Sequence, residues 1–147
     1  MRKTEKGVTL IELMTVMVVL GVLAAIAVPS YRRYLLRAQR TDATTALLRL
    51  QTAEEKFLLQ KGVYTTNLTE LPTASTAGLG LATGTSERGF YQLKVEPSAT
   101  GYTAIATPVS GAGQSDDTTC VEFSISETGV KKAKDSAGAD SRAQCWR

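Results

Sequence analysis

The sequence predicts an α+β protein in which one long amino-terminal helix packs on an antiparallel sheet of about four strands. Residues 30–61 contain no Gly or Pro, whereas ten of the 12 Gly and three of the four Pro lie from residue 62 onward. Apolar residues recur every three or four positions before residue 62, and they alternate with polar residues after residue 90. With 147 residues, the chain has room for one modest core.

The composition excludes several classes of function. The chain has no His, which removes the commonest general base and the commonest zinc ligand. Its two Cys cannot form a four-ligand metal site, so we expect no metal, no cofactor and no catalytic residue. A formal net charge of +3 is typical neither of a disordered tail nor of a dedicated nucleic-acid binder. A secreted or membrane-anchored enzyme with Ser–Lys or carboxylate chemistry is kept as a remote alternative.

The first element is an apolar run at residues 8–28, preceded by a basic flank. As a helix, its 21 residues are about 31 Å long, enough to cross the hydrocarbon core of a bilayer. The basic flank predicts a cytoplasmic amino terminus. A cleaved secretory signal is the alternative, because Ala25-Ile26-Ala27 has the small-x-small form of a cleavage site. The basic residues of the flank are Arg2, Lys3 and Lys6.

Glu12 lies inside this apolar run and argues against a simple secretory signal. The run is also longer than the ~7–15 apolar residues of such a signal. A carboxylate in the bilayer costs roughly 2.5–3.5 kcal/mol, so an intramembrane Glu is a functional-site hypothesis by default. The alternative is a Glu12 side chain that reaches the headgroups or that only favours the amino-terminal helix dipole.

The apolar spacing extends the helix beyond the membrane segment, over residues 8–61, to Gly62 as a natural stop. Such a helix runs about 80 Å, too long for a globular domain, so half of it is expected to protrude. Pro29 removes the hydrogen bond to the Ala25 carbonyl. Together with Gly21, it is expected to kink the helix or to melt it locally.

The second half of the chain predicts a loop and four strands. Residues 62–89 form a long surface loop with a short helical turn near residues 68–71. Strands are predicted at residues 91–96, 101–107, 121–125 and 130–134, the last one after a turn at Glu127-Thr128-Gly129. Their apolar face is expected to lie on the helix stripe from Leu50 to Phe57, in which the three- and four-residue spacing includes Ala53.

Cys120 and Cys145 predict a disulfide in an oxidising compartment, with two buried free thiols as the alternative. A bridge would close a loop of about 26 residues and stabilise the fold by roughly 3.5 kcal/mol. Trp146 is expected to cover the bridge rather than to form an exposed contact.

The segment Lys6-Gly7-Val8-Thr9-Leu10-Ile11-Glu12-Leu13 closely resembles the class III signal of type IV pilins and of the related type II secretion pseudopilins. Pro29, the helix after it and the carboxy-terminal cysteine pair extend the resemblance over most of the chain. One departure is Val8, where the family usually has Phe. The resemblance implies the pilin fold, in which the cysteine pair bounds a region on the filament surface.

The resemblance also implies how the chain is processed and divided. A prepilin peptidase is expected to cut between Gly7 and Val8 and to methylate the new amine of Val8. Glu12 is expected to act in methylation and assembly, and Pro29 either in assembly or merely as a kink. The expected parts are a leader at residues 1–7, a transmembrane and assembly helix at 8–29, and a periplasmic head at 30–147. Other pilin subunits and an inner-membrane assembly platform are the further expected partners.

The predicted function is that of a structural subunit of a bacterial type IV pilus, which serves motility, adhesion or DNA uptake. It would reside in the inner membrane before assembly and in an extracellular filament afterwards. The carboxy-terminal cysteine pair favours this over the alternative, a type II secretion pseudopilin, and the chain's ending favours a minor pilin. Two basic clusters could contact DNA, but a solvated helix face and edge-strand lysines explain them better. They are Arg32, Arg33, Arg37 and Arg40 on the helix, and Lys131, Lys132 and Lys134 on the last strand.

Overall fold

The computed structural model describes residues 7–98 and 101–146, and it has two compact units. The first unit ends at Leu35 and the second begins at Leu36. We call residues 7–35 the amino-terminal segment and the second unit the head. Helix α1, Leu10–Lys61, contributes to both units. Most of the leader, residues 1–6, lies outside the described residues.

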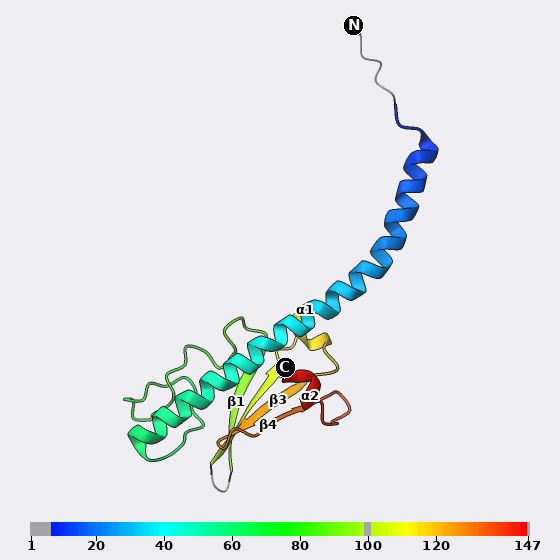
Figure 1. Ribbon diagram of the computed structural model, residues 1–147. Coiled ribbons are helices and arrows are strands. Elements are labelled where there is room, and N and C mark those ends of the chain that lie inside the picture. Colours follow the sequence, from blue (N-terminus) through cyan, green and yellow to red (C-terminus); the bar gives the residue numbers. More distant parts are fainter. Residues whose placement is uncertain (1–6, 99–100, 147) are drawn as a thin grey trace. The chain divides into compact units, whose positions relative to one another are not determined.

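The head contains a four-stranded antiparallel sheet in the order β1-β2-β3-β4 (Figure 1). The strands are β1 Tyr91–Pro97, β2 Tyr102–Pro108, β3 Glu122–Ser126 and β4 Lys131–Lys134. A short 3₁₀ helix, Gly113–Asp116, lies between β2 and β3, and helix α2, Arg142–Cys145, follows β4. The α+β prediction and its four strands are therefore confirmed, with no boundary displaced by more than one residue.

The register places one apolar row of each strand on the same face of the sheet. Tyr91 pairs with Pro108 at one end of β1 and β2, and Pro97 pairs with Tyr102 at the other end. Burial alternates along β1 and β2, as expected for strands with one covered face. The inward row consists of Tyr91, Leu93, Val95, Tyr102, Ala104, Ala106, Phe123, Ile125 and Ala133.

The second half of α1 covers this row and completes the core. Its buried residues are Ala43, Ala46, Leu47, Leu50, Glu54 and Phe57. The predicted stripe from Leu50 to Phe57 is part of this contact, but the buried surface begins earlier, at Ala43. A carboxyl group, that of Glu54, occupies a place in the stripe where the spacing suggested Ala53. Helix α1 ends before Gly62, which has a φ of +75° and donates its N–H to the Leu58 carbonyl at 2.7 Å.

Two local expectations are wrong in part or in full. Of the two effects expected from Gly21 and Pro29, local melting is wrong, because α1 is continuous through both residues and proline removes only one N–H from an otherwise intact ladder. The kink stays a prediction. Residues 68–70 form bends and Leu71 has no regular structure, so the expected helical turn at residues 68–71 is wrong. The Asn67 side chain accepts the Glu70 N–H, and the Asn67 and Leu68 carbonyls accept N–H groups from residues 79 and 81. These carbonyls are therefore occupied by a distant part of the loop instead of by the next helical turn.

Candidate functional site

The amino-terminal segment begins with a capped helix end. The Thr9 hydroxyl accepts the Glu12 N–H at 3.3 Å, and the Thr9 carbonyl accepts the Leu13 N–H at 3.2 Å. Thr9 and Glu12 thus stand at the first and last places of a Thr-x-x-Glu capping pattern, which was visible in the sequence. Gly7 and Val8 precede the helix, and both are exposed. The geometry leaves the Gly7–Val8 bond open and places Glu12 in the first helical turn.

The apolar side chains of the amino-terminal segment have no cover in the single chain. From Val8 to Val28, the large hydrophobic side chains are between 52% and 78% exposed. Pro29 is exposed too, and its carbonyl accepts a hydrogen bond from Arg33 Nε at 3.4 Å. An uncovered apolar surface of this extent marks a membrane or protein interface. Among the described residues, α1 is the helix that is long and apolar enough to cross a bilayer.

In the head, a disulfide joins Cys120 and Cys145, as the sequence predicts. Cys120 stands just before β3 and Cys145 ends α2, and both are buried. The bridge fixes the carboxy-terminal region, residues 135–146, to the start of β3. The backbone N–H of Ser141 also donates to the Ala133 carbonyl at 3.0 Å, so the region is attached to β4 as well.

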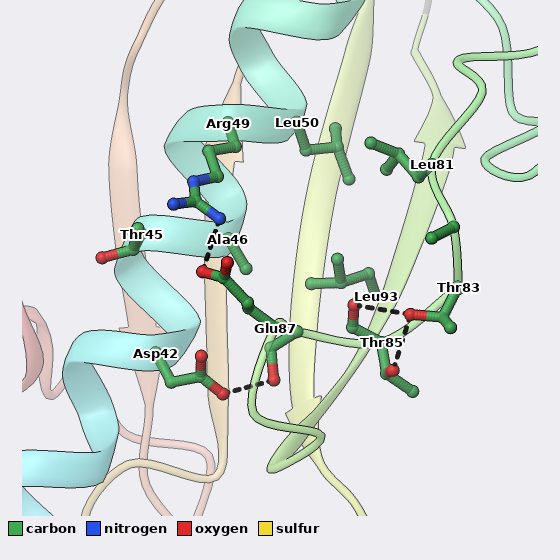
Figure 2. Close-up of a pocket in the computed structure, with 12 residues that line it drawn as sticks. Asp42, Thr45, Ala46, Arg49, Leu50, Leu81, Thr83, Thr85, Glu87 and Leu93 are labelled. Carbon is green, nitrogen blue, oxygen red and sulfur yellow. Dashed lines mark hydrogen bonds and ion pairs between the residues drawn. The ribbon is translucent and has the colours of Figure 1, made fainter.

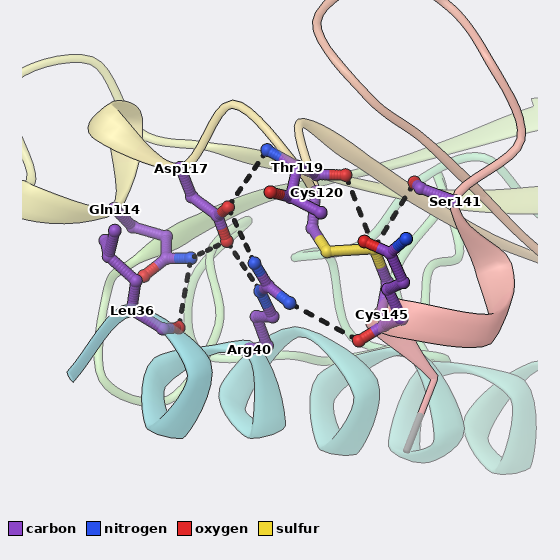
Figure 3. A network of polar contacts seen from close by, with 9 residues as sticks. Leu36, Arg40, Gln114, Asp117, Thr119, Cys120, Ser141 and Cys145 are labelled. Carbon is purple, nitrogen blue, oxygen red and sulfur yellow. Dashed lines mark hydrogen bonds and ion pairs between the residues drawn. A yellow bond between two sulfur atoms is a disulfide. The ribbon is translucent and has the colours of Figure 1, made fainter. Parts of the chain in front are cut away.

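A largely buried ion pair ties the loop before β3 to α1, beside the disulfide (Figure 3). Arg40 donates from Nε to Asp117 Oδ2 at 2.7 Å and from Nη2 to Asp117 Oδ1 at 2.8 Å. The two side chains are 12% and 2% exposed. The third Arg40 nitrogen, Nη1, reaches the Gln144 carbonyl at 3.3 Å, next to the disulfide. Arg40 is therefore a structural residue, not part of the solvated basic face that the sequence suggested.

Further hydrogen bonds complete the shell around Asp117. Its carboxylate accepts the Gln114 side-chain amide at 3.0 Å and the Thr119 N–H at 3.1 Å. Gln114 also donates to the Leu36 carbonyl of α1 at 3.4 Å. Burial, followed by the negative charge of Asp117, raises the pKa of the nearby Tyr91 hydroxyl. No sequence signal pointed to this network, because its members lie up to 78 residues apart.

The loop that precedes β1 is fastened to α1 across a small groove (Figure 2). The Ser86 hydroxyl donates to Asp42 at 2.5 Å, and Arg49 forms an ion pair with Glu87, also at 2.5 Å. Ala46, Leu50, Leu81 and Leu93 form the apolar part of the lining, and the volume is about 200 Å³. These four polar side chains at the groove bind one another, so we assign the groove a role in packing the loop against α1.

The basic residues of β4 have different environments. Lys134 forms an ion pair with Glu122 at 2.7 Å, and this hydrogen bond raises the pKa of Lys134. Lys131 lies over the Trp146 ring, 5.1 Å from its centroid, and Trp146 Nε1 donates to the Lys132 carbonyl at 2.8 Å. Trp146 is half-buried, and its ring meets that of Phe123 edge to face. The sequence has no aromatic residue among these lysines, but the disulfide at Cys145 brings the following residue, Trp146, close to them.

Comparison with known proteins decides the family. A family model described as "Type IV minor pilin ComP, DNA uptake sequence receptor" matches residues 29–124, more than half of the chain. The chain belongs to the type IV pilin family. A model of the prokaryotic N-terminal methylation motif matches residues 2–28 of this pilin, which confirms the class III leader.

Individual relatives of this pilin are pilus proteins as well. A fimbrial protein of Pseudomonas aeruginosa is 32% identical over 133 residues, covering 90% of this chain and 86% of that protein. The type IV major pilin protein PilE of Neisseria gonorrhoeae is 36% identical over 98 residues, or 65% of this chain and 54% of that one. A type IV pilin structure from Shewanella oneidensis aligns with a TM-score of 0.42 at 21% identity, over 65% of this chain and 89% of that chain.

These findings confirm the pilus-subunit prediction. This pilin is a structural subunit of a type IV pilus, and its family assembles with other pilin subunits. Its leader motif and apolar helix indicate anchoring in a membrane before it enters the extracellular filament.

Proposed function

We propose that this pilin is a minor subunit that enters the filament through residues 8–29, after a prepilin peptidase has cut between Gly7 and Val8. The observation that carries the proposal is the uncovered apolar helix with one carboxylate, Glu12, in its first turn. Removal of residues 1–7 would leave an ammonium on Val8 that can meet Glu12 of a neighbouring subunit. Such a pair sets register more than it adds net stability.

The proposal includes the cellular setting and the partners. Before assembly, the chain stands in the inner membrane with residues 30–147 in the periplasm, where Cys120 and Cys145 can be oxidised. An inner-membrane platform then moves the helix from lipid into the filament, and the exposed Pro29 belongs to the surface that is transferred. A structural subunit of this kind needs no catalytic group, and we assign it no enzymatic role.

Processing is tested by the mass of the pilin purified from its native host. We expect a chain that begins at a methylated Val8 and contains one disulfide. A chain that begins at Val28 would instead support cleavage after Ala25-Ile26-Ala27 by a signal peptidase.

The assembly role is tested by Glu12→Ala, with Thr15→Ala as the matched control. Both residues are exposed polar residues of the same apolar run, three positions apart. Glu12→Ala should insert and be cleaved like the wild type, but its amount in sheared filaments should fall roughly tenfold, as the loss of about 1.4 kcal/mol predicts. Thr15→Ala should assemble normally. Equal amounts of Glu12→Ala and wild type in filaments would refute the intersubunit role.

DNA binding is a second candidate function, favoured by the description of the matching family and by the edge of the sheet at β4. There, Lys131, Lys132 and Arg142 line a shallow exposed surface of the head. Trp146 beside Lys131 adds an aromatic ring, which DNA-binding surfaces use for stacking. Lys134 contributes less free charge, because it is paired with Glu122.

The DNA candidate is tested by replacing Lys131 and Lys132 together with Ala and measuring duplex binding against salt. Each lost phosphate contact should lower the salt slope by about 1. The control is Lys56→Ala with Lys61→Ala, which removes the same charge from the far end of α1. Equal loss in both double variants would mean attraction by net charge alone, and no loss in either would exclude the β4 edge.

A further inference from the structure

Glu54 is a carboxyl group buried in an apolar contact. It is 0% exposed, between Leu50 and Phe57 in the core stripe of α1. Its Oε2 accepts the Thr65 N–H at 3.2 Å, and no described residue donates to its Oε1. Asp117, the other deeply buried carboxylate, has an arginine and two hydrogen-bond donors instead. Glu54 therefore has one backbone hydrogen bond, and no cation, to compensate a negative charge.

Among the described residues, the titratable groups that interact with Glu54 are neutral or acidic. Glu55 is its neighbour on α1, and the charge of Glu54 acts on Tyr64 of the loop and on Tyr102 of β2. Glu127, from the turn after β3, acts on the same two tyrosines. Burial, followed by the negative charges of Glu54 and Glu55, raises the pKa of the Tyr102 hydroxyl. Burial likewise raises the pKa of Glu54 to about 7, against the opposing effect of the Thr65 hydrogen bond.

The residue bound to Glu54 organises the segment at residues 62–81. Thr65 Oγ1 donates to the Ala77 carbonyl at 3.3 Å and accepts the Asn67 N–H at 3.1 Å. The segment then folds back on itself, since Leu79 N–H donates to the Asn67 carbonyl at 2.9 Å. Leu68 and Leu79 pack against the core from this segment. The Glu54–Thr65 hydrogen bond thus ties a self-bonded unit to α1.

We propose that Glu54 is a proton-operated latch, which holds residues 62–81 on the head while its carboxyl is protonated and loosens them when it ionises. A neutral carboxyl is tolerated in an interior without a cation, but a carboxylate requires hydration. Once the proton leaves for the solvent, water must reach Oε1, and separation of Thr65 from Glu54 would admit it. Opening there releases the segment as a unit and uncovers Leu68 and Leu79.

The direction of the pH dependence follows from the raised pKa. The opened form has the ordinary pKa of 4.5, and the closed form has the value of about 7. Between these two pKa values, the closed form binds more protons than the opened form. Protonation therefore stabilises the closed form fully below the pKa of the opened form, and this stabilisation is lost as the pH rises through the pKa of the closed form. The latch therefore switches near neutral pH, and a subunit exposes more apolar surface when the pH is above neutral.

The test is hydrogen exchange of the full-length chain in detergent micelles at pH 5 and pH 8, with rates corrected for intrinsic exchange. In the wild type, protection of residues 62–81 should fall on the order of 50-fold between the two values. Glu54→Gln keeps an oxygen for the Thr65 N–H but cannot ionise, so its protection should be nearly independent of pH. Glu70→Gln is the matched control and should behave like the wild type, because Glu70 lies in the same segment but is exposed.

Two results would overturn the latch: constant protection in the wild type, or the same 50-fold fall in Glu54→Gln. If Glu54→Gln does not fold, the wild type alone decides, through the carbon-13 resonance of the Glu54 carboxyl. It should titrate near neutral pH together with the amides of residues 62–81. Titration below about pH 5, or amides with a different midpoint, would equally exclude the latch.

Discussion

The two halves of α1 share one secondary structure and differ in what stabilises it. All residues at 10–35 are exposed, whereas residues 36–61 bury a stripe that includes Ala43, Leu47 and Leu50. Most helix stability in proteins comes from packing of one face, and the first half has no such packing in the single chain. The first half is thus built for lipid or for other subunits, and the second half for its own head.

Polar residues show the same contrast. In the first half, the hydrogen bonds of Arg33 and Glu12 are local: the Arg33 side chain donates to the Pro29 carbonyl at 3.4 Å, and Glu12 contacts Thr9 and Thr15 through its backbone. In the second half, Arg40 and Glu54 reach across the head to residues 117 and 65. A substitution should therefore affect assembly in the first half and folding in the second.

The largest expected difference between the halves is that between Arg40→Ala and Arg33→Ala. Arg40→Ala leaves Asp117 buried without its cation, which should lower the free energy of unfolding by about 3–5 kcal/mol. Arg33→Ala removes an exposed side chain and should change it by less than about 0.5 kcal/mol. Urea unfolding of the full chain in micelles measures both, with Trp146 as the single tryptophan reporter. Equal effects of the two variants would contradict a structural role for the Arg40–Asp117 pair.

This contrast also marks what sequence alone can predict. The alternation of Tyr91, Leu93 and Val95 predicted β1, and the three-and-four spacing before Gly62 predicted the helix. Such patterns are local, because each element repeats its own period. The cleavage and assembly roles of Gly7, Val8, Glu12 and Pro29 come from a local motif as well, and they stay predictions.

The polar contacts of the head had no local signal. Arg40 and Asp117 are 77 residues apart, and no spacing rule pairs them. Glu54 stands where an apolar residue is expected, so periodicity assigned that place to Ala53. Trp146 meets Lys131 only because the chain folds back through the Cys120–Cys145 bridge. Fold class and core follow from patterning, whereas charge pairing requires the tertiary structure.

The disulfide sharpens the comparison, because it and Arg40 hold the same carboxy-terminal region. The bridge joins Cys145 to the start of β3, and Arg40 of α1 donates to the Gln144 carbonyl. Cys145→Ser should cost roughly 3.5 kcal/mol and free residues 135–146. Hydrogen exchange should therefore rise in these residues but not at Asp117, which Arg40 still holds. Exchange that rises equally at residues 114–119 would mean that the ion pair depends on the bridge. Thiol labelling of the unreduced wild type should find no free cysteine, and two labels per chain would remove the bridge.

The smallest expected effects have opposite signs in the two halves, at Gly21 and Gly62. Both glycines have open space where a Cβ would stand. Gly21 lies inside α1, so Gly21→Ala should favour the helix by about 0.5–1 kcal/mol. Gly62 has a φ of +75°, so Gly62→Ala should cost about 1–2 kcal/mol through backbone strain alone.

Each glycine variant needs the measurement that matches its half of the helix. For Gly21→Ala, thermal loss of the helical circular dichroism signal in micelles should begin at a higher temperature, while urea unfolding of the head stays at the wild-type midpoint. For Gly62→Ala, the urea midpoint reported by Trp146 should fall. A lowered urea midpoint in Gly21→Ala would show that the first half of α1 contributes to the stability of the head, and the distinction between the two halves would then fail.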